Sequence, residues 1–515
     1  MPHEEKVAGG RSSRLVVLQS VATATFSVLP PFLVGALGVS LRSEFGFGPE
    51  FLGFAVAWFF IVVALAAPRL GGVVERLGIR AGFTLGGILT ALTLVGVGLA
   101  PFPAFILIAL TVGGVANAIV QPAVNAALSA LIPGGHLGLA IGIKQSSIPA
   151  ATLLGGFAVS TLTVVVGWRW TFATAAGLSL LNGLVAWVSQ IEPPRRAASA
   201  RRGRRPINSL PHHHSLVILT GGAFLAAAAA TTLGAFQVDG GVAIGLSESG
   251  AGLVFAGSSA FGLITRVIVG WLADRHPTRS RYGAIIGLLL LGAPGFLLLA
   301  TPYPAAYVLG AFLAYGAAWG WPGLFHYSVV SQYPAMPAAA TGVLQSGVAA
   351  GAGLGPLAFG LVAGRVSYQA AWVSAGLLCL IGAMLFAVGR RRLRRSLREN
   401  VRPTAPPRLA AEDGSFRPTP RVLRDGVETW DVPSPDGMTT LLRLAPRSFW
   451  TARASFAPTV VVGVIDGDGL DLRIGSLPRS ARPGDAYELP TGLLWTVENL
   501  GAAPAIIAVL PRHGE

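Results

Sequence analysis

The chain has 515 residues, of which 52% are hydrophobic and only 12% are charged, and its net charge is +15. A soluble globular protein carries about 25% charged residues, so this chain has about half the charge that a water-facing surface needs. The composition excludes a soluble enzyme as the main body, and the single cysteine, Cys379, excludes a disulfide framework and a metal site built from several cysteines.

Apolar stretches long enough to cross a bilayer dominate residues 15–389. A spanning helix needs ~20 residues, because each residue adds ~1.5 Å toward the ~30 Å of hydrocarbon. We therefore expect an all-α membrane region, whose first stretch is a retained helix because no small-residue cleavage site stands out. The sequence predicts twelve transmembrane helices, at residues 15–38, 51–71, 81–100, 104–130, 138–165, 169–189, 215–237, 249–271, 282–301, 304–331, 338–364 and 369–389.

Basic residues in the loops predict the orientation of these helices. Twenty of them lie on one side of an even-span layout, against three on the other side. Loops rich in Lys and Arg stay in the cytoplasm, so we expect a multi-pass protein of the cell (inner or cytoplasmic) membrane with both termini cytoplasmic. The positive charge then serves topology and contact with anionic lipid of the bilayer, and no nucleic-acid partner is expected.

The two groups of six helices repeat each other. Four residues of the first group recur at an offset of 200 in the second, since Pro122, Gly142, Gln145 and Gly155 match Pro322, Gly342, Gln345 and Gly355. Parallel six-helix repeats are one architecture of transporters, with the solute site near the midplane between them. The predicted segments are an N-terminus (1–14), a first bundle (15–189), a basic linker (190–214), a second bundle (215–389), a basic and proline-rich linker (390–420) and a soluble β domain (421–515).

Two loops at the ends of even-numbered spans carry one charged pattern. The segments 71-GGVVERLGIR-80 and 270-GWLADRHPTR-279 each place an acid four residues after a glycine and an arginine next to the acid. The pattern resembles the signature loop of the major facilitator superfamily, G-x3-[DE]-R-x-G-x-[RK], although Pro277 replaces a glycine in the second copy. The resemblance covers residues 15–389 and implies two bundles that open in alternation. The expected conformational latch comprises Gly71, Glu75, Arg76, Gly78, Arg80, Gly270, Asp274 and Arg275, with Arg266 either bracing the loop or binding an anionic group.

Polar residues inside the spans are candidates for the wall of a solute cavity. A charge in a membrane segment indicates a functional site, although Lys144 lies close enough to a helix end to reach water. The run 142-GIKQ-145 is similar to one in facilitators of small anionic solutes. Span four carries a polar stripe at i, i+4 and i+8, and span one carries a softer one, with helix packing as the alternative for both. The candidates are Gln19, Thr23, Asn117, Gln121, Asn125, Lys144, Gln145, Trp321, His326 and Gln345.

Two absences argue against a proton-driven drug exporter. An apolar residue near Leu110 stands where such exporters of the family carry an arginine, and Pro149 lacks the preceding glycine of their fifth helix. Asp239 lies at the outer end of span seven, where solvation is easy, so we do not expect it to carry protons. A hydrogen-bonded structural role is the alternative for His326.

The C-terminal segment 421–515 has short β-prone runs between Gly, Asp and Pro, typical of a small all-β module. Its stretch 484-GDAYELPTGLLWTVEN-499 looks like the second motif of a cupin barrel at Gly484, Pro490, Gly492 and Asn499, with Trp495 in place of the metal-binding His. Residues 449–466 contain no His and no Glu, so no metal and no cofactor are expected. A small ligand in the barrel is one interpretation, and a ligand-free domain is the other.

Together these features predict a secondary active transporter and not an enzyme. The expected solute is small, organic and anionic, because Lys144 and Arg266 lie in spans that contain no firmly intramembrane acid. Two alternatives stay open. One is efflux of apolar or aromatic compounds, and the other is a membrane receptor that reports solute through the cupin-like domain.

Overall fold

The computed structural model describes the helical region at residues 3–131, 143–189, 212–275, 281–333 and 337–400. In the C-terminal region it describes residues 402–403, 421–424, 427–434, 437–446, 449–453, 459–466, 470–474, 477–490 and 494–512. The predicted linker 190–214 lies largely outside the described residues. Of the predicted linker 390–420, the residues up to 400 and residues 402–403 are described, and the others are not.

Long apolar helices build the first half of the membrane region. Hydrocarbon offers no hydrogen-bond partners, so the backbone groups of a spanning segment must bond to one another, as they do in a helix. Two of these helices begin at a proline, Pro49 and Pro103, whose missing N–H costs nothing at a first helical position. The elements are α1 (His3–Ala36), α2 (Gly38–Phe45), α3 (Pro49–Leu77), α4 (Ile79–Gly98), α5 (Pro103–Leu131), α7 (Ser147–Ala158), the π-helical turn η2 (Val159–Thr163) and α8 (Val164–Val188).

The second half contains the same kinds of helix and one marked interruption. The tenth predicted span is split, because a π-helical turn and a break at Gly320 separate two shorter helices. The elements are α9 (His213–Ala243), α10 (Glu248–Arg275), α11 (Arg281–Leu299), α12 (Pro304–Leu313), the π-helical turn η4 (Ala314–Ala318), α13 (Pro322–Gln332), α14 (Pro337–Arg365) and α15 (Tyr368–Asn400).

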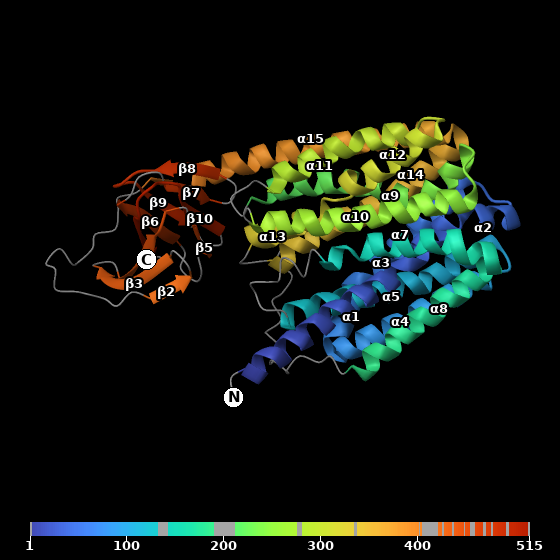
Figure 1. Ribbon diagram of the computed structural model, residues 1–515, viewed down its shortest axis with the longest axis horizontal. Helices are drawn as coiled ribbons and strands as arrows, with labels where there is room; N and C mark the ends of the chain where they lie inside the picture. Colours follow the sequence, from blue (N-terminus) through green and yellow to red (C-terminus); the bar gives the residue numbers. More distant parts are fainter. Residues whose placement is uncertain are drawn as a thin grey trace.

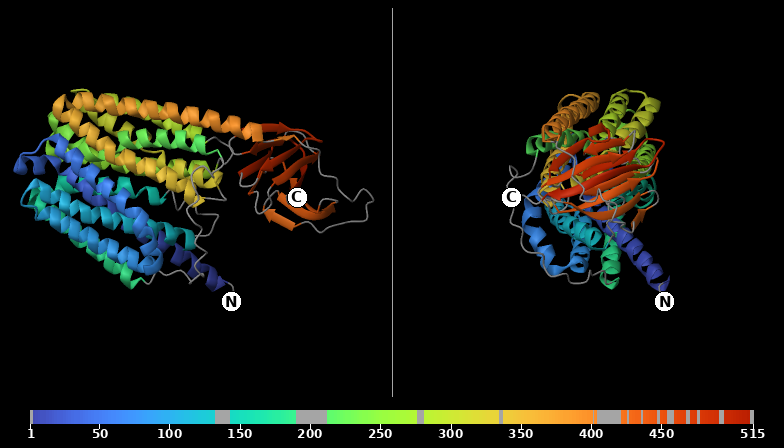
Figure 2. Two further views of the ribbon diagram at one scale, coloured as in Figure 1. Left: turned by 180° about the vertical axis from the view of Figure 1, so that it is seen from behind. Right: turned by 90° about the vertical axis from the view of Figure 1, so that its left-hand side faces the viewer.

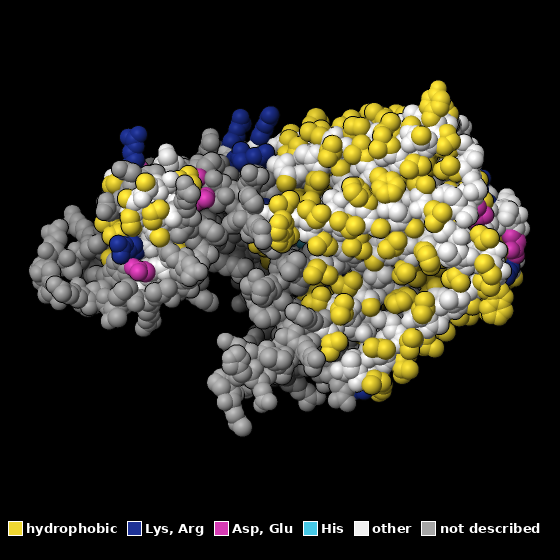
Figure 3. All heavy atoms as spheres, in the orientation of Figure 1, with side chains coloured by type: hydrophobic (Ala, Val, Ile, Leu, Met, Phe, Trp, Pro, Cys, Tyr) yellow, Lys and Arg dark blue, Asp and Glu magenta, His cyan; other side chains and the backbone are white. Residues whose placement is uncertain are grey.

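Eleven apolar segments among the described residues are long enough to cross a membrane. One of them, Ile143–Val188, has 46 residues and contains Gly167 at a φ of +80°, a conformation that glycine adopts without strain. At this position the chain turns back, so the segment accounts for two predicted spans, 138–165 and 169–189. Many large hydrophobic side chains are exposed on the helices, and they are spread over the face of the helical region seen in Figure 3, as expected for contact with lipid.

The two halves lie side by side, and the β region lies beyond one end of the bundle (Figures 1 and 2). Across the halves α3 packs on α14, α7 on α10, and α1 on α9. The start of α1 and the β region lie at the same end, and α2 lies at the opposite end (Figure 1). These are called the β-domain end and the α2 end below.

The C-terminal region forms two antiparallel sheets. The larger has the order β1-β9-β6-β11-β4-β3-β2, and the smaller has the order β5-β10-β7-β8. Strands β1 and β2 are edges of the larger sheet, so the described strands form no closed barrel and the predicted cupin barrel is not confirmed. The strands are β1 (Arg402–Pro403), β2 (Arg421–Arg424), β3 (Val427–Ser434), β4 (Gly437–Leu444), β5 (Phe449–Arg453), β6 (Thr459–Asp466), β7 (Leu470–Ile474), β8 (Leu477–Ala481), β9 (Ala486–Pro490), β10 (Leu494–Asn499) and β11 (Ala505–Arg512).

The residues of the cupin-like motif serve local structure in these sheets. Gly484 has a φ of +89° and donates its N–H to the carbonyl of Val464 at 2.9 Å, which fixes the turn before β9. Asn499 is fully buried, and its Nδ2 donates to the carbonyls of Leu444 at 3.0 Å and Ala503 at 2.8 Å. Pro490 ends β9 and Trp495 lies in β10, whereas Gly492 and the side chain of Trp495 lie outside the described part.

The helix α15 leads directly into the larger sheet. It runs through 33 residues to Asn400, and β1 follows at Arg402–Pro403. Arg402 and Pro403 pair with Glu488 and Tyr487 of β9. The sheet therefore includes the chain two residues after the helix ends, although the sequence predicted a linker there.

Candidate functional site

The repeat-related glutamines Gln145 and Gln345 approach the same histidine. Nε2 of Gln145 lies 2.9 Å from Nδ1 of His326, and Nε2 of His326 lies 3.2 Å from Oε1 of Gln345. The carbonyl of Pro322 lies 2.9 Å from the same Nδ1. Because Gln145 belongs to the first half and the other residues to the second, this chain of hydrogen bonds joins the halves inside the bundle.

Arg266 of α10 is 5% exposed and makes a second connection between the halves. Its Nε donates to the carbonyl of Trp319 at 3.0 Å, and its Nη1 donates to the carbonyl of Gln145. Both acceptors are neutral backbone oxygens, so no carboxylate of the described part neutralises this guanidinium. Arg266 therefore contacts the interior of the bundle, and no described contact links it to the 270–279 loop.

Lys144 is also buried, at 9% exposure, next to Gln145 in the chain. None of the three ion pairs among the described residues includes Lys144 or Arg266. Asp239 is the single acid among the described residues that is less than one-tenth exposed, and its partner is Arg42. Two buried cations, one from each half, thus have no acidic partner in the described part, and Gln145 is a chain neighbour of the first and a hydrogen-bond partner of the second.

Aromatic rings lie beside Arg266. The Cζ of Arg266 lies 5.7 Å from the centre of the Trp319 ring, which lies 5.1 Å from Tyr315 and 6.1 Å from Phe32. The hydroxyls of Tyr315 and Ser259 are buried, and neither has a hydrogen-bond partner of good geometry among the described residues. These two donors and the two cations are groups that can bind an anionic solute carrying an apolar part.

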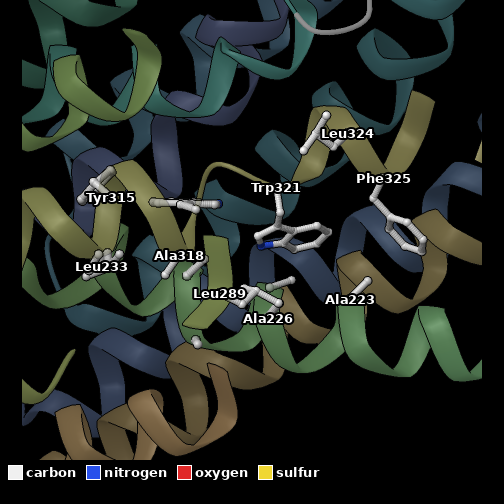
Figure 4. Close-up of a cluster of buried hydrophobic side chains, with 14 of the residues drawn as sticks. Ala223, Ala226, Leu233, Leu289, Tyr315, Ala318, Trp321, Leu324 and Phe325 are labelled. Atoms are coloured by element: carbon white, nitrogen blue, oxygen red, sulfur yellow. The ribbon is translucent and has the colours of Figure 1, made fainter. Parts of the chain in front are cut away.

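Trp321 belongs to the packed interior of the second half. Its side chain is fully buried, and it lies among Leu289, Leu324 and Phe325 (Figure 4). The alanines of α9, Ala223 and Ala226, lie beside it (Figure 4). This packing favours a structural role over the cavity position that the sequence predicted.

The polar stripe of α1 is used for helix packing. Nε2 of Gln19 donates to Oδ1 of Asn182 at 3.2 Å, and Nδ2 of Asn182 donates to Oγ1 of Thr23 at 3.2 Å. Asn182 lies in α8 of the same half. Gln19 and Thr23 therefore fit the packing alternative.

The stripe of α5 divides into a buried and an accessible part. Nδ2 of Asn117 donates to Oγ of Ser27 at 3.0 Å, which ties α5 to α1. Gln121 is half-buried and Asn125 is exposed. Only the last two residues of the stripe are thus accessible enough to contact a solute.

A network of charged and polar side chains closes the α2 end. Nη1 of Arg42 in α2 lies 2.7 Å from Oδ2 of Asp239 in α9 and donates to the Tyr368 hydroxyl at 3.1 Å. The Tyr368 hydroxyl donates to Asp239. Oγ of Ser40 donates to Oε1 of Glu248 at 2.6 Å. The contacts of Arg42 and Ser40 cross from the first half to the second, whereas the bond between Tyr368 and Asp239 lies within the second half.

Backbone packing supports the closure of this end. A Cβ added to Gly35 of α1 would lie 2.7 Å from the Cα of Ala235 in α9. Nη2 of Arg169 lies close to Oε1 of Glu44, within the first half, and this hydrogen bond lowers the pKa of Glu44. The α2 end is therefore shut, while the ribbons of the two halves diverge toward the β-domain end (Figure 1).

The predicted latch is described in part. Gly78 has a φ of +86° and makes the turn between α3 and α4, and the guanidinium of Arg80 lies 4.0 Å from the centre of the Trp187 ring. Arg76 is exposed, and a Cβ on Gly270 would meet nothing within 4 Å. Gly71 lies in α3, and the side chains of Glu75, Asp274 and Arg275 lie outside the described part.

Several residues of this site escape a reading of the sequence. The ion pair of Arg42 and Asp239 joins positions that no local pattern relates, and Tyr368 and Asn182 gave no signal. Ser259 and Tyr315 stand in apolar stretches whose period indicates only a buried helix. Among the described residues no group of three or more His, Cys, Asp or Glu side chains is placed to hold a metal ion.

Comparisons with known proteins identify relatives of this architecture. A sequence model of the Major Facilitator Superfamily matches residues 15–243 and 218–465. The bacterial homologue of the human lysosomal transporter Spinster, solved in an inward-facing, unoccupied conformation, is 18% identical with a TM-score of 0.63. The match covers 75% of this chain and 98% of that one. The same protein in an inward-facing, occupied conformation is also 18% identical, with a TM-score of 0.61 and coverage of 74% and 98%.

A further solved structure, a mutant of the nucleoside transporter NupG, is 16% identical with a TM-score of 0.59. That match covers 73% of this chain and 99% of the other. No curated protein matches the sequence. At these identities the solved structures establish the fold of the helical region and nothing about its solute.

Proposed function

The chain belongs to the Major Facilitator Superfamily, and from this premise we propose that it is a secondary active transporter for a small organic anion. The two halves would rock about a central site in alternating access. We further propose that it lies in the cell membrane with both termini in the cytoplasm, as the basic loops predict. The observation that carries the choice of solute is the pair of buried cations, Lys144 and Arg266, without an acidic partner in the described part.

Uncompensated buried charge supports an anionic solute. A charged group in a low-dielectric interior is costly unless an opposite charge or several hydrogen bonds offset it. Arg266 has two neutral carbonyl acceptors. A carboxylate between the two cations would supply the missing charge, with the hydroxyls of Tyr315 and Ser259 as further donors.

The geometry of the proposed site would differ between the two open states of the bundle. Lys144 and Gln145 belong to the first half, whereas Arg266 and His326 belong to the second half. When the halves rotate, the distance between these groups changes, so the affinity for an anion differs between the two states. Such a difference is what allows a solute to drive a conformational change.

Uptake by purified protein in lipid vesicles tests the proposal. We expect uptake or exchange of at least one member of a panel of small carboxylates and sulfonates. Lys144→Gln and Arg266→Gln should each lower that uptake at least about tenfold, because hydrogen bonds to charged groups contribute roughly 1.5–3 kcal/mol. The matched control is Arg169→Gln, which removes an arginine within the first half at the α2 end and should leave uptake near that of the unaltered protein.

Other outcomes would contradict the anionic solute. Unchanged uptake in both Lys144→Gln and Arg266→Gln would remove its basis. The panel therefore includes nucleosides and neutral aromatic compounds, since one structural relative is a nucleoside transporter. Movement of aromatic compounds alone, in the outward direction, would favour efflux. Binding without accumulation or exchange would favour a receptor that reports through the β domain.

A further inference from the structure

One face of α15 is not covered by any helix of the described part. Five apolar side chains on this face are all at least 40% exposed: Leu377, Leu380, Ile381, Met384 and Val388. Their spacing of three and four residues places them on one side of the helix. The opposite side packs into the bundle through fully buried residues such as Cys379 and Phe386. In a membrane the uncovered stripe faces lipid chains.

Three arginines follow the apolar stripe on the same face of α15. Arg391, Arg392 and Arg395 follow Val388 by three, four and seven residues, so they lie on the same side of α15, and all three are exposed. At ~1.5 Å per residue they lie roughly 5 to 10 Å beyond the last apolar residue of the stripe. That distance reaches the headgroup layer, which extends a bilayer from ~30 Å of hydrocarbon to ~40–45 Å.

These arginines have no acidic partner among the described residues, whose ion pairs all lie elsewhere. Arg390 adds a further charge beside them, with its guanidinium close to Gly283 near the start of α11. A basic cluster is visible between the apolar surface of the bundle and the β region (Figure 3). The surface thus has an apolar strip that can contact the acyl chains of a phospholipid and a positive end that can contact its phosphate.

We propose that Arg391, Arg392 and Arg395 bind the phosphate headgroup of an anionic phospholipid whose chains lie along the Leu377–Val388 stripe. Guanidinium groups match phosphate oxygens with paired hydrogen bonds, and each basic side chain near a bilayer surface adds to the attraction of anionic lipid. The continuity of charge with the apolar stripe favours a lipid over a free phosphate. This inference concerns the outer surface of the second half and does not depend on the identity of the solute.

Native mass spectrometry of the full purified chain tests the proposal, with phosphatidylglycerol and phosphatidylcholine added in turn. We expect the unaltered protein to retain phosphatidylglycerol in preference to phosphatidylcholine. The triple variant Arg391→Gln, Arg392→Gln, Arg395→Gln should bind the anionic lipid about one hundredfold more weakly, from roughly fivefold for each charge near the surface. The control triple Arg365→Gln, Arg443→Gln, Arg482→Gln changes the net charge equally at exposed positions and should bind as the unaltered protein does.

A charge-preserving variant and a competition experiment complete the test. The triple variant with lysine at positions 391, 392 and 395 keeps the charge, so we expect its binding to stay within about tenfold of the unaltered protein. Equal binding by the glutamine triple and the unaltered protein would overturn the proposal, as would equal retention of the two lipids. Displacement of the lipid by millimolar glycerol 3-phosphate would assign the arginines to a soluble phosphate and would also overturn it.

Discussion

Arg42 and Asp239 lie 197 positions apart in the sequence, yet Nη1 of the first and Oδ2 of the second are 2.7 Å apart. The pair is completed by Tyr368, so it involves α2 of the first half and both α9 and α15 of the second. Asp239 is 5% exposed and Arg42 is 29% exposed. An alternating-access cycle that opens the α2 end must separate these groups.

Neutralising either partner should shift the bundle toward a state open at the α2 end. In Asp239→Asn and Arg42→Gln the charge-assisted contact, with a contribution of roughly 1.5–3 kcal/mol, is lost or weakened. The open population should rise at least about tenfold. Spin labels at Ser43→Cys and Gln369→Cys, which are exposed positions in α2 and α15, report the separation of the halves.

Cys379 is buried, so it will compete little for the labels. Arg169→Gln is the control, because it removes an ion pair at the same end but within one half. Identical distance distributions for the unaltered protein and the Asp239→Asn variant would show that the ion pair does not hold this end closed.

Gly35→Ala should prevent the tight closure of the α2 end. The new Cβ would lie 2.7 Å from the Cα of Ala235 and 2.9 Å from its carbonyl oxygen, and backbone atoms cannot move aside as a flexible side chain can. Overpacking of this kind costs about 1–3 kcal/mol. The midpoint of thermal unfolding should fall below that of Gly177→Ala, a control site where a Cβ meets nothing within 4 Å. Equal midpoints would contradict the packing argument.

His326→Phe should lower solute uptake at least about tenfold. Phenylalanine keeps an aromatic ring but removes both nitrogens, so the amides of Gln145 and Gln345 lose their shared partner. The buried amide of Gln145 is then left unpaired, at a cost of roughly 1–3 kcal/mol, whereas water can bind the exposed amide of Gln345. His326→Gln, which can still donate and accept, should retain more uptake. His214→Phe alters an exposed imidazole at the start of α9 and serves as control. Uptake by His326→Phe at the unaltered rate would exclude this role.

Asn499→Ala should loosen the β domain without altering the bundle. The substitution leaves the buried carbonyl of Leu444 without its amide donor, and the N–H of Gly501 without its acceptor at 2.9 Å. We expect a loss of about 2 kcal/mol in local stability. Hydrogen exchange at β10 and β11, compared with the neighbouring change Glu498→Ala, measures it. Unaltered exchange in Asn499→Ala would contradict the structural role.

The long apolar stretches made most of the helical fold predictable. Their length identified the spans, and the turn at Gly167 agrees with the predicted boundary between spans five and six. The sequence did not predict α2, because eight residues with mixed polarity are too short to show a period. It also ended the last helix at 389, although Arg and Leu after that position are good helix formers and extend α15 to Asn400.

The site was less predictable because periodicity gives the polar face of a helix but not the neighbour of that face. Gln19 and Thr23 share such a face, yet that face meets Asn182 of α8. The offset of 200 related Gln145 to Gln345, but it gave no sign that both would contact His326 of α13, which follows the break at Gly320. The ion pair of Arg42 with Asp239 joins residues 197 positions apart, and no local sequence pattern indicates it.

Because α15 continues without a break to the β domain, movement of the helix would also move that domain. The helix has 33 residues and contains no proline, and β1 pairs with β9 two residues after its end. A rod of this kind is ~50 Å long at ~1.5 Å per residue, so a tilt of about 10° would swing its far tip by roughly 9 Å. Rocking of the second half would therefore displace the β sheets at the tip of α15 further than it displaces the helices of the bundle.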